Sequence, residues 1–124
     1  MGLFEVEVTI SNPAAPERAV RPSLLVDTGA TLSWVPSALL DSIGIAPVGR
    51  RIFLLADGRR VERQTGIVAL SLDGVTTGAT AVFAEAGEGA MLGAAALEEL
   101  GVVVDPVDKK LLPHDLMAVG ASAF

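Results

Sequence analysis

The sequence predicts a domain that is mainly β, with one or two short helices. Apolar residues alternate with polar ones from Phe4 to Ile10, which is the period of a half-buried strand. Two Asp-Gly pairs, at residues 57–58 and 73–74, are each flanked by strand-type residues, and Asp-Gly is typical of hairpin turns. Helical patterns are limited to two short stretches, so the fold class is all-β with minor helical content.

In the N-terminal half, the first strand is followed by the Pro-rich stretch 11–22. We interpret this stretch as a connection, because proline cannot lie in a central strand of a sheet. Residues 24–26 form a strongly apolar strand that we expect to anchor the following turn, residues 27–29, in the core. A second strand passes through residues 31–35. Residues 36–44 begin with Pro and end with Gly, which predicts a short helix.

In the C-terminal half, the β pattern returns over residues 51–84, and the two Asp-Gly turns divide it into consecutive hairpins. Residues 85–90 are typical of a flexible loop. Residues 94–100 have high helical propensity and are followed directly by Gly101. Residues 102–112 predict two short strands around an Asp-Pro turn.

No linker separates two domains, and 124 residues are the size of one ordinary domain with its own core. We expect one domain over residues 1–113. The tail, residues 114–124, is small and Ala-rich, and we expect it to be disordered or to lie at a dimer interface. Residues 24–45 and 90–104 share the order apolar run, glycine, helix, glycine, which suggests a duplicated half-fold.

The composition excludes several classes of function. A net charge of −6 argues against a nucleic-acid partner, and the basic residues around 50–63 are interpreted as the solvated face of a hairpin. No cysteine and a single histidine, His114, leave no ligand set for zinc and no thiol nucleophile. No apolar stretch is long enough to span a bilayer. We therefore expect a cytoplasmic protein that has no metal, no cofactor and no membrane contact.

Residues 24–30, Leu-Leu-Val-Asp-Thr-Gly-Ala, followed by a strand and a helix, resemble the active-site motif of retropepsin-like aspartic proteases. The particular likeness is to their single-domain bacterial members. The hairpin over residues 53–65 stands in the place of the family's flap, and "AMLGAAALEELG" resembles its second signature. "VVVDPVDKKLLP" resembles its closing hairpin, so the resemblance covers most of residues 3–113. It implies a retropepsin-like acid protease barrel that is half of a two-fold dimer.

The resemblance also implies roles for individual residues. Asp27 would be the catalytic residue. Thr28, Gly29 and Ala30 would support the active-site loop and contact the substrate backbone. Substrate-binding roles in the flap and the second motif would fall to six residues (Leu55, Ala56, Asp57, Gly58, Met91 and Leu92).

Hydrolysis of a peptide without metal, Cys or His requires a group that activates water and a group that protonates the leaving nitrogen. Two neighbouring carboxylates can divide these tasks, because close like charges cannot both ionise readily. Among the other aspartates, Asp105 is the only rival, because it follows three valines, and the Pro106 after it makes it a turn residue. The remaining ones lie in the predicted helix (Asp41), in turns before glycine (Asp57 and Asp73) or in polar or tail surroundings (Asp108 and Asp115). The second carboxylate must then be Asp27 of a second copy, which predicts a homodimer that acts on a peptide or protein substrate.

Three alternatives remain open. Asp27 alone also fits a turn carboxylate that accepts backbone N–H bonds. Trp34 is interpreted as a core residue, with a substrate subsite as the other possibility. Ala94 and Ala95 stand where the family commonly carries Arg and Asn or Asp, so side-chain bracing of the active-site loop is missing. The alternative function is therefore a catalytically weak dimerisation or peptide-binding module.

Overall fold

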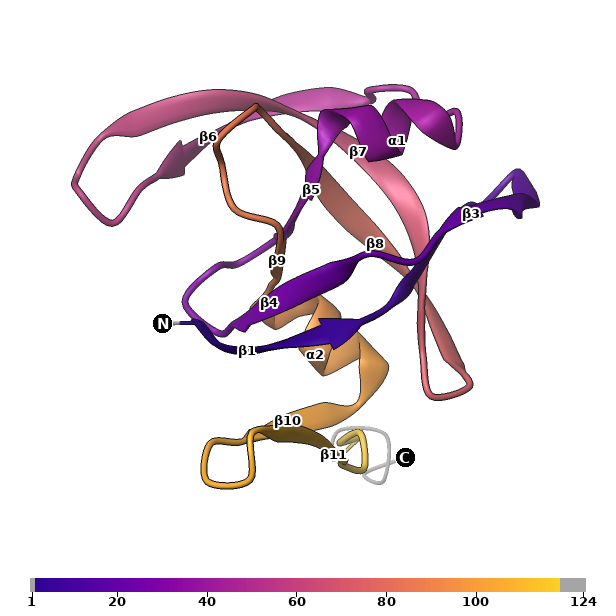
Figure 1. Cartoon of the computed structure of the whole chain (residues 1–124), viewed down its shortest axis with the longest axis vertical. Helices are drawn as coiled ribbons and strands as arrows, with labels where there is room; N and C mark the ends of the chain where they lie inside the picture. Colours follow the sequence, from indigo (N-terminus) through magenta and orange to yellow (C-terminus); the bar gives the residue numbers. More distant parts are fainter. Residues whose placement is uncertain (1, 119–124) are drawn as a thin grey trace.

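A computed structural model describes residues 2–118, and these residues form a mostly β fold with two short helices, as predicted (Figure 1). The strands are β1 (Gly2–Glu7), β2 (Thr9–Asn12), β3 (Ala15–Val20), β4 (Ser23–Asp27), β5 (Ser33–Pro36), β6 (Gly49–Leu54), β7 (Arg60–Leu72), β8 (Val75–Ala84), β9 (Met91–Leu92), β10 (Val102–Asp105) and β11 (Lys110–Pro113). The helices are α1 (Ser37–Ser42) and α2 (Ala94–Leu100).

One large sheet closes on itself through the first two strands. Eight of its nine strands follow the order β1-β4-β9-β5-β8-β7-β2-β3. The ninth strand, β6, pairs with β7 outside this path. β1 pairs with β4 and β2 pairs with β7, yet only Val8 separates β1 from β2. The strand predicted over residues 4–10 is therefore two strands, because its halves bond to opposite ends of the sheet. The closed sheet confirms the predicted retropepsin-like barrel.

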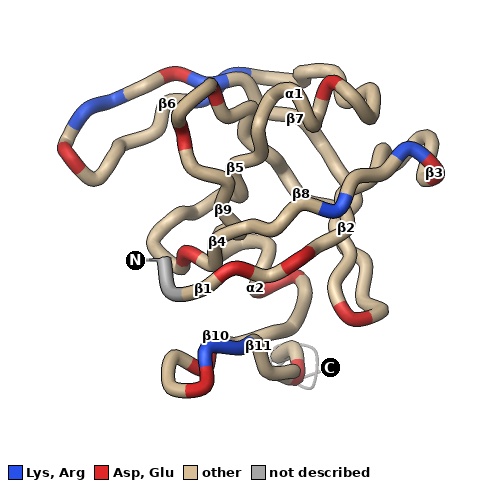
Figure 2. The backbone as a smooth tube through the Cα atoms, in the orientation of Figure 1, with Lys and Arg blue, Asp and Glu red and all other residues tan. Residues whose placement is uncertain are grey.

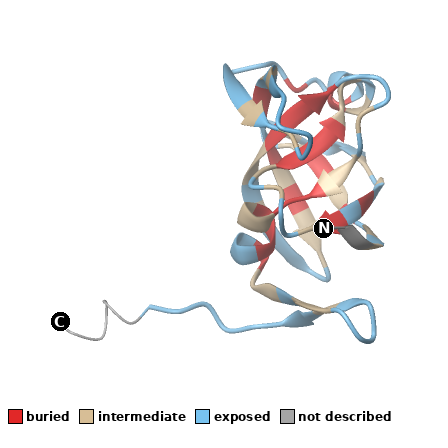
Figure 3. Ribbon diagram, turned by 90° about the vertical axis from the view of Figure 1, so that its left-hand side faces the viewer, coloured by how far each residue is buried: buried red, intermediate tan, exposed pale blue. Residues whose placement is uncertain are grey.

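The core is built by the inward positions of these strands. Val8, Ile10, Val68 and Leu70 are at most 1% exposed, and the helices add Leu40, Leu97 and Leu100 to the same cluster (Figure 3). Burial of each such side chain stabilises the fold by about 1.5–3 kcal/mol. In β4, Leu24 and Val26 are fully buried, as predicted. The expectation that Leu25 also anchors the turn is wrong, since it is 37% exposed on the other face of the strand.

Two predicted boundaries differ from the structure. The stretch 11–22 is not only a connection, because it contains β3, which pairs with β2 at the end of the sheet. Pro16 is tolerated there because it lies in the edge strand β3, where the register with β2 shifts. The strand predicted over residues 31–35 begins at Ser33, since the preceding residues belong to the loop after Asp27.

The hairpins and the second helix were predicted with their turns. Asp73 and Gly74 join β7 to β8 with φ of 50° and 82°, the positive values that a two-residue hairpin turn requires. α2 ends at Gly101, which has φ of 69° and adopts the left-handed conformation typical of a helix C-terminus. The first helix is likewise followed by a glycine, Gly44, with φ of 76°.

β10 and β11 form a separate hairpin beside α2, as predicted. Asp105 accepts hydrogen bonds from the amides of Val107 and Asp108 at 3.0 and 3.1 Å, so it is a turn residue. Residues 114–118 of the predicted tail are exposed and have no regular structure (Figure 3), and residues 119–124 lie outside the described part of the chain. Neither helix within residues 2–118 has the length and hydropathy needed to cross a membrane.

Candidate active site

Asp27 is the last residue of β4, where the chain turns sharply. Its Oδ1 accepts a hydrogen bond from the amide of Gly29 at 2.9 Å, and its carbonyl oxygen accepts one from the amide of Ala30 at 3.2 Å. The side chain is half-buried. Asp27 therefore shapes the turn, as the turn interpretation requires, and the same turn fixes the direction of its carboxylate.

The loop after Asp27 is held by the start of α2. The amides of Ala94 and Ala95 donate to the carbonyl oxygens of Ala30 and Thr31 at 2.7 and 3.0 Å. Just upstream, β9 pairs in parallel with β4, so that both signatures lie side by side. The bracing that is absent from the side chains of residues 94 and 95 is thus supplied by their backbone amides.

Gly93 lets this contact form. A Cβ atom at residue 93 would lie 2.5 Å from the carbonyl oxygen of Leu32 and 2.9 Å from that of Ala30. Both atoms belong to backbone, which cannot rotate away as a flexible side chain can. The second signature therefore needs glycine here for close approach of two backbone segments rather than for an unusual φ.

Ser33 contributes a third bond to the same contact. Its Oγ accepts a hydrogen bond from the amide of Gly93 at 3.0 Å, and its side chain is buried, with a relative exposure of 2%. This residue was not singled out from the sequence. The sequence signal that could have identified it is a serine between Leu32 and Trp34, at an inward position of a strand.

We expect Ser33→Ala to lower the free energy of unfolding by about 1–2 kcal/mol, because the buried amide of Gly93 loses its acceptor. Urea unfolding of the two proteins measures this difference. Ser23→Ala, at an exposed position of β4, is the control and is expected to change stability by less than about 0.5 kcal/mol. Equal stability of Ser33→Ala and wild type would show that this bond contributes nothing.

The hairpin of β6 and β7 lies opposite the Asp27 loop. Its two strands pair from Gly49 with Thr65 to Leu54 with Arg60. The tip is closed by hydrogen bonds between Leu55 and residues 58–59 of 2.8–3.0 Å. The amide and guanidinium of Arg59 both bond the carboxylate of Asp57, and this lowers the pKa of Asp57.

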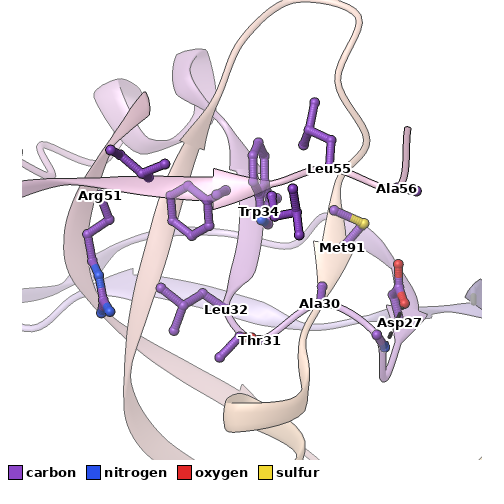
Figure 4. Close-up of a pocket in the computed structure, with 13 residues that line it drawn as sticks. Asp27, Ala30, Thr31, Leu32, Trp34, Arg51, Leu55, Ala56 and Met91 are labelled. Carbon is purple, nitrogen blue, oxygen red and sulfur yellow. Dashed lines mark hydrogen bonds between the residues drawn. The ribbon is translucent and has the colours of Figure 1, made fainter. Parts of the chain in front are cut away.

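A cleft of about 650 Å³ lies between this hairpin and the Asp27 loop (Figure 4). Its lining comprises Asp27, residues 29–32, Trp34, residues 51–56 and Met91. Most of these residues have apolar side chains, and Asp27, Thr31 and Arg51 add polar groups.

Trp34 is a core residue, as interpreted from the sequence, and it also borders the cleft. It is 6% exposed and packs on Val82 and Ala84, as a core residue does. It also lines the cleft, where its ring meets that of Phe53 edge-to-face with 5.1 Å between centroids. This pair joins the hairpin to the body of the domain and forms the middle of the apolar wall.

The cleft brings together six of the residues expected at the site (Asp27, Gly29, Ala30, Leu55, Ala56 and Met91). The other four do not line it. Thr28 is exposed, and Asp57 and Gly58 lie at the exposed end of the hairpin. Leu92 is fully buried in the core, because alternation along β9 turns Met91 toward the cleft and Leu92 away from it. Direct substrate binding by the Leu92 side chain is therefore corrected to a packing role.

An ion pair connects the loop before β9 to the base of the hairpin. The guanidinium of Arg63 bonds both carboxylate oxygens of Glu88, with Nε–Oε1 and Nη2–Oε2 distances of 3.1 and 2.5 Å, and it also lies 3.5 Å from Glu85. The side chain of Arg63 is only 14% exposed. Arg63 is thus not part of a solvated face, contrary to the expectation for the basic residues of this hairpin. The hydrogen bond from Arg63 lowers the pKa of Glu88.

The pKa of Glu88 is lower in the folded protein than its ordinary value of 4.5. The ion pair therefore stabilises the protein fully at pH values above 4.5, and this stabilisation is lost as the pH falls through the lowered pKa. We expect Glu88→Gln to cost about 1 kcal/mol at neutral pH and nothing at low pH. Unfolding in urea between about pH 3 and pH 7 measures this. The control is Glu62→Gln. Glu62 is paired with Arg50, whose side chain is 57% exposed, so this change should have little effect on the free energy of unfolding at any pH. A cost of Glu88→Gln that does not vary with pH would contradict the assignment.

Comparison with known proteins supports the fold and the family. A family model described as "Aspartyl protease" matches residues 6–108. No curated protein matches the chain. The solved structure of EIAV protease, in complex with the inhibitor HBY-793, is similar with a TM-score of 0.54 and 20% identity, over 82% of this chain and 91% of that chain.

Two further solved structures are similar. The retroviral protease-like domain of Ddi1 from Leishmania major has a TM-score of 0.52 and 16% identity, over 94% of this chain and 99% of that chain. The protease of simian foamy virus (mac) has a TM-score of 0.50 and 17% identity, over 76% of this chain and 91% of that chain. At these identities the likeness is one of fold.

Proposed function

Since this chain belongs to the aspartyl protease family, we propose that it is an aspartic endopeptidase that acts as a homodimer. Each subunit contributes one Asp27 to an active site on the two-fold axis. The observation that carries this proposal is the position of Asp27, at the edge of an apolar cleft and on a loop fixed by backbone hydrogen bonds from residues 94 and 95. A carboxylate held in this way is oriented before the substrate arrives.

In the proposed reaction, a water molecule lies between the two Asp27 carboxylates. One carboxylate, ionised, takes a proton from the water as its oxygen attacks the carbonyl carbon of the peptide bond. The other, protonated, stabilises the oxygen that becomes negatively charged. The C–N bond then breaks as the carboxyl that took the proton from the water passes it to the leaving nitrogen, which leaves one new carboxyl group and one new amine.

Exposed groups of the subunit support the proposed dimer. Thr28 is exposed beside Asp27, where it can meet the second copy. Five apolar residues of the C-terminal region are 37–85% exposed (Val103, Val107, Leu112, Leu116 and Met117). Exposed apolar patches of this kind mark contact sites on proteins that are otherwise well packed.

The hairpin of β6 and β7 is proposed to act as a flap over the substrate. Within the described strands β6 pairs only with β7, so its other edge has backbone groups that can bond an extended peptide. Closure of such a hairpin excludes water from the reaction. Leu55 and Ala56, at the cleft side of the tip, would contact the peptide, and so would Met91 on the opposite wall.

The test is incubation of the purified protein with a diverse peptide mixture from about pH 4 to pH 7, with cuts identified by mass spectrometry. Sedimentation under the same conditions gives the oligomeric state. We expect internal cuts and a dimer. A folded dimer that binds peptides without cutting them would instead favour the alternative, a binding module, for which the alanines at residues 94 and 95 are the observation in favour.

A further inference from the structure

We propose that Arg51 selects substrates that carry a carboxylate at a distance from the bond that is cut. The proposal rests on the proposed function of the cleft. Among the described residues that line the cleft, Arg51 and Asp27 are the only charged ones. The cleft of a protein whose net charge is −6 thus contains one cation.

The side chain of Arg51 lies on the cleft face of β6. Side chains alternate along a strand, so Arg51 shares its face with Phe53 and Leu55. These two pack on the cluster that contains Trp34. Figure 4 shows Arg51 and Asp27 at opposite ends of the cleft, with Leu32 and Trp34 between them.

Arg51 has no carboxylate partner within residues 2–118, whereas its neighbours do. Three other arginines of the hairpin are paired (Arg50 with Glu62, Arg59 with Asp57, and Arg63 with Glu85 and Glu88). Arg63 is the residue opposite Arg51 on β7, and the carboxylates of Glu85 and Glu88 offset its charge. Arg51 is therefore a cation of the cleft without a carboxylate partner among the described residues, and a carboxylate carried by a bound peptide would provide one.

The positions of the lining residues define the expected peptide. An apolar side chain lies against Leu32 and Trp34, and an acidic side chain lies further out at Arg51. In a two-fold dimer with Asp27 on the axis, an Arg51 stands at each outer end of the joined cleft. Peptides with an acidic residue on both sides of the cut bond are thus favoured over those with one.

The test uses peptides blocked at both ends, with Glu or Gln placed in turn at each position up to about five residues from the cut bond. We expect one position on each side at which Glu increases kcat/KM by about 3- to 10-fold over Gln, mainly through KM. Arg51→Gln removes the preference and Arg51→Glu changes it to a preference for Lys. Arg60→Gln, an exposed position on the same hairpin outside the cleft, retains it.

Ionic strength and a second set of peptides provide two further tests of the role of Arg51. The preference should shrink as ionic strength rises, because Arg51 is exposed and exposed charges are screened. Peptides with a free C-terminal carboxylate, but no acidic side chain, test whether a chain end can take the same place. A preference for Glu that survives in Arg51→Gln, or no preference at any position, overturns the proposal.

Binding separates this proposal from the proposed hydrolysis. Fluorescence anisotropy with labelled Glu and Gln peptides, on wild type and on Asp27→Asn with and without Arg51→Gln, needs no cleavage. If wild type cuts nothing yet binds the Glu peptide more tightly through Arg51, hydrolysis is wrong and the assignment of Arg51 stands. Equal binding of both peptides, or no binding of either, overturns the assignment.

Discussion

Asp27→Asn removes peptide cleavage and leaves the fold intact. We expect kcat to fall by about 10³-fold or more, because asparagine can neither take a proton from water nor return one. The fold is retained because the amide oxygen of asparagine can still accept the bond from Gly29 that shapes the turn. Cleavage of a fluorogenic peptide measures the loss, and thermal unfolding measures the fold, with a change in Tm of at most about 2–3 °C.

Mixing the two proteins tests whether the site is shared. If each site needs two copies of Asp27, activity falls with the square of the wild-type fraction once subunits have exchanged. An equimolar mixture then has about a quarter of the wild-type activity, because only that fraction of dimers carries two aspartates. A linear decline, to about half, would show that one subunit suffices and would contradict the dimeric mechanism. Asp41→Asn, on the exposed side of α1, is the control and retains full activity.

Gly93→Ala is expected to have the largest effect on stability. The added Cβ would lie 2.5 Å from the carbonyl oxygen of Leu32, so either the active-site loop or the start of α2 must move. We expect a loss of about 3 kcal/mol in the free energy of unfolding and a decrease in Tm of about 10 °C. Activity falls as well, because the moved loop carries Asp27.

Gly78→Ala is the matched control for this change. A Cβ at Gly78, in β8, would have no atom within 4 Å, and its φ is not in the left-handed region. We expect its stability to equal that of wild type within about 0.5 kcal/mol. Calorimetry of the three proteins decides the point. A Gly93→Ala protein as stable as the control would mean that the two backbone segments do not approach as described.

Features that depend on a few neighbouring residues were predictable. The two Asp-Gly pairs mark their hairpin turns because glycine accepts positive φ, and Gly58 and Gly74 have φ of 87° and 82°. The end of α2 at Gly101 follows from the same property. Asp27 was identified because an apolar strand leads directly into a carboxylate. In the structure Asp27 is the last residue of that strand and is half-buried.

Features that depend on partners far along the chain were not predictable. The alternation from Phe4 to Ile10 continues without a break through Val8, although the strand changes partner there. Met91 and Leu92 are both apolar, and only the position of β9 decides which of them reaches the cleft. The arginines of the hairpin, drawn blue in Figure 2, look alike in sequence. Within residues 2–118, however, Arg63 is paired with glutamates and Arg51 is not.

The backbone contact between α2 and the loop after Asp27 has a consequence for the order of folding. The loop gains its last hydrogen bonds only when residues 93–95 reach it, and these residues follow it by more than 60 positions. Contacts so distant in sequence form slowly, since a long stretch of chain must be ordered first. On the ribosome, the region around Asp27 therefore remains incomplete until most of the chain has been synthesised. A nascent or truncated chain that lacks α2 has Asp27 but lacks the backbone contacts that fix the loop after it.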